Sequence, residues 1–122
     1  MKFVISESAP KPAGPYSHAV VVEKFVFVSG QIPIRENGEI PEKFEERVKT
    51  VIENVRVILK DVGLDLENVV KVTVYLKDLS KFNEFNKVYE RYFKNKPARS
   101  VIGVSDLPKG VDIEMEVVAF RP

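Results

Sequence analysis

The chain has 122 residues, enough to bury one hydrophobic core and too few for two, so a single domain over 1–122 is expected. Its 44% hydrophobic and 30% charged residues are typical of an ordinary folded protein. The 19 Lys and Arg residues nearly cancel the 18 Asp and Glu residues. This balance argues against a nucleic-acid partner, because such proteins need clustered cations.

The absence of cysteine excludes disulfides, thiolate nucleophiles and cysteine-based metal sites. The first ten residues hold a short apolar run that Ser, Glu and Pro interrupt, which is too brief for a signal peptide. No later segment approaches the length of a membrane span. A cytoplasmic protein without a membrane partner is therefore expected.

The first half of the chain predicts two strands and a long helix. Residues 19–28 are rich in Val and Phe and are interrupted only by Glu23 and Lys24, which predicts a hairpin of two short strands. Gly30 is expected at the end of the second strand. Between 41 and 62 the apolar residues recur at steps of three and four, which predicts a helix with one face in water.

The second half predicts three strands and another helix. Residues 69–76 alternate, and the side expected to pack on helices carries Val70, Val72, Val74 and Leu76. Ser80 is predicted to cap a helix that continues to about Phe93. Residues 98–104 and 111–120 predict the last two strands, which would form a hairpin if neighbours in sequence simply paired.

The order of these elements predicts an α+β fold. Two helices can cover only one face of such a sheet, so the other face needs another cover. For a chain this short, association with copies of itself is the economical solution. An oligomer is therefore expected.

His18 is the only histidine, and it stands beside Ser17. Adjacent residues on a strand point to opposite faces, so these two cannot act together as base and nucleophile there. A single histidine also excludes a histidine metal cage and a two-histidine ribonuclease mechanism. We interpret His18 as a partly exposed structural residue and expect no metal site.

Charged residues on the last two strands have two interpretations. Glu114 lies between Asp112 and Glu116 in strict alternation with apolar residues, which usually means a strand with one wet face. A carboxylate recessed in a cleft would instead orient a water or move a proton. Arg99 is either a surface residue with a snorkelling stem or a planar fork for a substrate carboxylate. The residues alone leave these alternatives open.

Five segments resemble, in order, motifs of the RidA/YjgF family of small imine/enamine deaminases. They are AGPYS at 13–17, SGQIP at 29–33, the helix with Phe82, Asn86, Tyr89 and Phe93, PARSV at 97–101, and LPKG at 107–110 followed by IEME at 113–116. Each motif is weak alone, whereas the ordered set over nearly the whole chain is highly specific.

This resemblance implies a chorismate-mutase-like α+β fold, with two helices on one face of a mixed sheet. It also implies a barrel-like homotrimer with ligand clefts between subunits. The last strand then inserts between earlier strands, in place of a terminal hairpin.

The resemblance also implies roles for individual residues. Arg99 matches the family's carboxylate-binding arginine, and Glu114 matches the glutamate that positions the hydrolytic water. The positions that match the lining of the family's pocket are Tyr16, Ser29, Gly30, Asn86 and Val101. Many relatives carry a cysteine where this chain has Val101, so thiol chemistry is excluded there, although a backbone group at Val101 could still contact a ligand or water.

The activity implied is hydrolysis of 2-iminobutanoate or 2-iminopropanoate to a 2-keto acid and ammonia, without a cofactor. A module that senses small carboxylates without turnover is the main alternative, because an arginine clamp alone would serve binding. An endoribonuclease or translation inhibitor is a further alternative, and the single histidine and balanced charge count against it.

Overall fold

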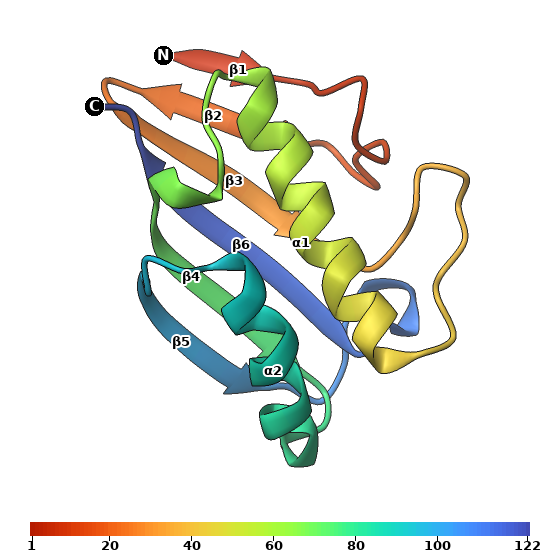
Figure 1. The fold of residues 1–122 in the computed structure, drawn as a ribbon. Helices are drawn as coiled ribbons and strands as arrows, with labels where there is room; N and C mark the ends of the chain where they lie inside the picture. Colours follow the sequence, from red (N-terminus) through yellow and green to blue (C-terminus); the bar gives the residue numbers. More distant parts are fainter.

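The computed structural model describes residues 1–122 as one six-stranded sheet with two helices on one of its faces (Figure 1). The α+β class expected from the sequence is confirmed. The strands are β1 Lys2–Val4, β2 Ala19–Val22, β3 Phe25–Gln31, β4 Val69–Leu76, β5 Ala98–Gly103 and β6 Ile113–Phe120. The helices are α1 Phe44–Asp61 and α2 Phe82–Tyr92. Neither helix is both long and apolar enough to cross a membrane.

The order of strands across the sheet is β1-β2-β3-β6-β4-β5. The last strand, β6, lies between β3 and β4 and is antiparallel to both, whereas β5 pairs in parallel with β4 at the edge. The simple hairpin of β5 and β6 is therefore wrong, and the insertion implied by the family resemblance is found. Alternate residues of β6 are fully buried, which suits a central strand: Ile113, Met115, Val117 and Ala119.

Helix α1 forms because its apolar residues make one continuous stripe, and that stripe packs on the sheet. The helix begins at Phe44, three residues after the predicted start. The Arg47 guanidinium fixes this end, since it donates to the carbonyls of Pro41 and Glu42 and to both carboxylate oxygens of Asp112 at 2.8 and 2.9 Å.

Helix α2 has a different start from the predicted one. Asp78, not Ser80, provides the cap: its Oδ1 accepts from the Ser80 amide at 2.9 Å and begins a short 3₁₀ turn at Leu79–Lys81. The helix proper then runs from Phe82 to Tyr92.

Strand β4 alternates as predicted except at its start. The register slips between Val69 and Lys71, so Val69 is buried and Val70 is 43% exposed. From Lys71 onward the predicted alternation holds, with Val72 and Val74 fully buried toward the helices.

The face of the sheet that turns away from the helices is uncovered in one chain; we call it the open face. Its apolar part, over β1, β2, β3 and the end of β6, consists of Phe3, Val20, Val22, Phe25, Phe27, Val118 and Phe120. Its polar part, over β4, β5 and the start of β6, consists of Lys71, Thr73, Tyr75, Ser100, Glu114 and Glu116. Phe27 is 47% exposed in the middle of the apolar part.

His18 has the predicted structural role, but it is 1% exposed, so the expected partial exposure is wrong. Its Nδ1 accepts from the Ser6 amide at 2.8 Å, and its Nε2 lies 2.7 Å from the Pro10 carbonyl, to which it donates. These bonds attach the N-terminal segment to the sheet. The imidazole is buried because both of its nitrogens are satisfied by backbone groups.

Candidate active site

Arg99 is half-buried on the helix side of the sheet. It pairs across β4 with Val72, which packs toward the helices, and paired residues point to the same face. Its Nη1 donates to the Asn86 Oδ1 of α2 at 2.8 Å. Two of the residues that the family resemblance assigned to the ligand site, Arg99 and Asn86, are therefore in direct contact.

The Arg99 guanidinium is surrounded by aromatic rings and lacks a counter-ion. Its Cζ lies 4.7 Å from the ring centroid of Tyr89, 5.6 Å from that of Phe82 and 5.7 Å from that of Phe85. Arg47, Arg56 and Arg91 each form an ion pair with a carboxylate, and Arg99 forms none. Arg99 helps to line a hollow together with Lys96 and Glu90. A guanidinium without a carboxylate partner can bind an anion there.

The ring of Tyr89 packs against the Arg99 guanidinium. Its ring stacks on Phe93 at a centroid distance of 4.5 Å, and its side chain is 7% exposed. The buried hydroxyl has no hydrogen-bond partner, and burial raises the pKa of Tyr89 to about 12. Tyr89 therefore stays neutral and presents its ring face to the cation.

Glu114 is half-buried on the open face, against the end of β3. A Cβ at Gly30 would lie 2.9 Å from the Glu114 carboxyl carbon and closer still to one of its oxygens. A side chain at position 30 would therefore displace the Glu114 carboxylate from its present place. Burial raises the pKa of Glu114 above its usual value, and the negative charge of Glu116 raises it further.

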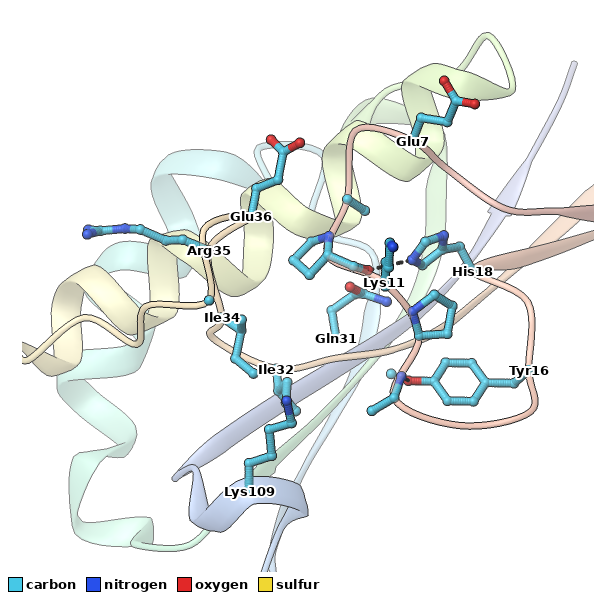
Figure 2. A pocket seen from close by; sticks show the side chains of 16 residues that line it. Glu7, Lys11, Tyr16, His18, Gln31, Ile32, Ile34, Arg35, Glu36 and Lys109 are labelled. Atoms are coloured by element: carbon cyan, nitrogen blue, oxygen red, sulfur yellow. Dashed lines mark hydrogen bonds between the residues drawn. The ribbon is translucent and has the colours of Figure 1, made fainter.

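Tyr16 and Ser29 lie near this end of β3. The Ser29 hydroxyl donates to the Ser17 carbonyl at 2.7 Å, and the Tyr16 hydroxyl accepts from the Ala13 amide at 3.1 Å. Tyr16 and Gly30 help to line a pocket, which Figure 2 shows between the loop that carries Tyr16 and the segment after β3.

The predicted site residues thus form two groups in one chain. Arg99 pairs with Val72 and Glu114 pairs with Tyr75; because Val72 and Tyr75 are three positions apart on β4, the two charged residues point to opposite faces. Val101 points to the same face as Arg99 and packs against the core. One chain alone cannot bring Arg99 and Glu114 to the same ligand.

Comparison with known proteins identifies the family. A family model described as endoribonuclease L-PSP matches residues 6–121. A RutC family protein of Pyrococcus abyssi is 54% identical over 97% of this chain and 95% of its own length. The crystal structure of the YjgF gene product of E. coli superposes with a TM-score of 0.95 at 37% identity, over 100% of both chains. The chain belongs to the RidA/YjgF family.

A second solved RidA/YjgF structure holds an amino acid. E. coli TdcF with bound serine superposes with a TM-score of 0.96 at 36% identity, again over 100% of both chains.

The sequence did not reveal the aromatic surroundings of Arg99 or the pairing of Tyr75 with Glu116. Phe82, Asn86 and Tyr89 share one face of α2 by their spacing, and that spacing is the only sequence signal for the first group.

Proposed function

We propose that the protein hydrolyses small 2-imino acids, such as 2-iminobutanoate and 2-iminopropanoate, to 2-keto acids and ammonia. The observation that carries this proposal is the Arg99 guanidinium, which is half-buried, oriented by Asn86 and without a carboxylate partner. A planar fork of this kind suits a substrate carboxylate held by two parallel hydrogen bonds. The serine bound to TdcF also carries a carboxylate.

In the proposed mechanism, Arg99 binds the carboxylate and Glu114 acts on water. Water oxygen adds to C2 of the protonated imine while Glu114 accepts a proton from that water. Glu114 then returns the proton to the nitrogen. As the C2–N bond breaks and ammonia leaves, the C2 hydroxyl gives its proton to Glu114 and becomes the carbonyl of the 2-keto acid. Glu114 passes this proton, which equals the one brought by the protonated imine, to ammonia or solvent. A positioned acid/base group of this kind contributes on the order of 10²–10⁴-fold, which suits a substrate that already hydrolyses in water.

We propose that each site lies between neighbouring chains of a homotrimer. Arg99 and Glu114 point to opposite faces of one sheet, so a second chain must bring its Glu114 to the first chain's Arg99. The exposed phenylalanines of the open face offer the apolar surface on which such chains would pack.

Two other functions compete with this proposal. A carboxylate-sensing module would need the Arg99 hollow but not Glu114, and the raised pKa of Glu114 favours proton transfer. An endoribonuclease, the activity in the family model's description, is disfavoured because both ring nitrogens of the single histidine already bind backbone groups.

Turnover of 2-iminobutanoate tests the proposal. An amino-acid oxidase generates the imine in the presence of semicarbazide, and trapped semicarbazone is followed by absorbance. We expect the protein to lower the rate of trapping in proportion to its concentration, at sub-stoichiometric amounts, while heat-denatured protein does not. Unchanged trapping together with measurable 2-oxobutanoate binding would instead identify a sensing module.

A further inference from the structure

The open face carries a second carboxylate beside Glu114. Glu114 and Glu116 lie two residues apart on β6 and point to the same face. Tyr75 lies opposite Glu114 in the register of β4 and β6, and its hydroxyl donates to Glu116 Oε1. The Tyr75 side chain therefore starts opposite Glu114 and reaches diagonally across to the carboxylate of Glu116.

The two carboxylates have different surroundings. Glu116 accepts a hydrogen bond from Tyr75, whose own pKa is raised to about 12 chiefly by that bond, so the phenol remains a donor through the neutral range. That bond occupies one oxygen of the Glu116 carboxylate. Glu114 has no hydrogen-bond donor and no cation within ion-pair distance in the chain, and it is packed over Gly30. Any proton that enters the pair is therefore held more readily by Glu114.

Few other charged groups face the pair. Lys71, the one cation on this face of β4, donates to the Ser100 hydroxyl of β5 at 3.1 Å and pairs with neither carboxylate. From β3, Gly30 lies against Glu114, and Phe27 pairs with Val118, two positions after Glu116; neither residue titrates. Asp112, just before β6, is bound to Arg47 of α1. In the proposed trimer a neighbour's Arg99 also approaches, and its constant charge affects every variant alike.

We propose that Glu116, whose carboxylate accepts the Tyr75 hydroxyl, is a positioning residue that favours placement of the exchangeable proton on Glu114. Its catalytic consequence rests on the proposed function, since a group that accepts and returns a proton works best when it titrates near the operating pH.

Carboxyl ¹³C NMR titration of the full-length protein tests the assignment without reference to activity. We expect the Glu114 carboxyl to titrate above the usual glutamate range. Glu116→Gln should lower the Glu114 midpoint, because it removes the neighbouring negative charge. A double variant that also carries Tyr75→Phe should match Glu116→Gln at Glu114, because the phenol acts through Glu116. Glu39→Gln, which removes a carboxylate that is 68% exposed in the loop before α1, should leave the Glu114 midpoint in place.

A Glu114 midpoint in the usual glutamate range, or one that does not respond to Glu116→Gln, would overturn the assignment. A purely structural role of Glu116 would lower stability without moving the Glu114 midpoint. The pH–rate profile adds the catalytic test: the acid limb of the Glu116→Gln profile should lie at lower pH than that of the wild type. If the Glu114 midpoint responds as expected but the protein does not turn over the imine, this inference holds and the proposed function is rejected. If the protein turns over the imine but the Glu114 midpoint does not respond, the proposed function holds and this inference is rejected.

Discussion

Replacing Arg99 with alanine should lower kcat/KM for 2-iminobutanoate by about 100- to 1,000-fold. In the proposed mechanism the guanidinium supplies the charge-assisted bonds to the substrate carboxylate, and truncating one partner of a desolvated charge pair costs about 3–4 kcal/mol. Its loss should also abolish measurable binding of 2-oxobutanoate. Steady-state kinetics and isothermal titration measure the two effects.

Two further variants separate the geometry of Arg99 from its charge. Arg99→Lys keeps the charge but loses the planar fork, so it should recover only part of the activity. Arg91→Ala removes an equal charge from α2, where Arg91 contacts Glu45 at 3.3 Å, and should leave kinetics near the wild-type level. Activity of Arg99→Ala within threefold of wild type, or an equal loss in Arg91→Ala, would contradict the clamp.

Replacing Glu114 with glutamine should lower kcat by about 10²–10⁴-fold and leave the affinity for 2-oxobutanoate within a few-fold of wild type. The amide keeps the shape that packs over Gly30 but cannot accept the proton of the attacking water. Single-turnover kinetics measures the chemical step, and isothermal titration measures binding.

Glu84→Gln is the matched control for this variant. Glu84 is an exposed α2 glutamate that lies 3.9 Å from Lys81, and its substitution should change neither quantity. Full kcat in Glu114→Gln would mean that another group activates the water. Loss of ligand binding together with kcat would place Glu114 in binding instead of proton transfer.

Local patterns in the sequence were sufficient to predict those helices and strands that bury one face and expose the other. The three- and four-residue steps of 41–62 predicted α1, and the alternation of 69–76 predicted β4, because each pattern reports which side meets the core. Strand pairing was not readable in this way. The position of β6 between β3 and β4 depends on contacts between segments far apart in the chain.

The site was predictable only in part. Arg99 and Glu114 were ambiguous from the residues alone, because the same charges serve solvated surfaces and clefts; the family resemblance selected them. Their opposite orientation became clear only from the register of β4. The burial of His18 could not be predicted from the sequence either. Its hydrogen-bond partners are the backbone amide of Ser6 and the backbone carbonyl of Pro10, and backbone groups leave no signal in the residue types.

Mixing Arg99→Ala chains with Glu114→Gln chains tests most directly whether this is a deaminase with sites built by two chains. The variants are denatured together in equal amounts, refolded, and assayed with 2-iminobutanoate beside each variant refolded alone. A site is complete when it takes Arg99 from a Glu114→Gln chain and Glu114 from an Arg99→Ala chain, which random assembly gives in about one case in four. We expect about a quarter of wild-type activity in the mixture and almost none in either variant alone. A mixture no more active than the separate variants would contradict a site shared between chains.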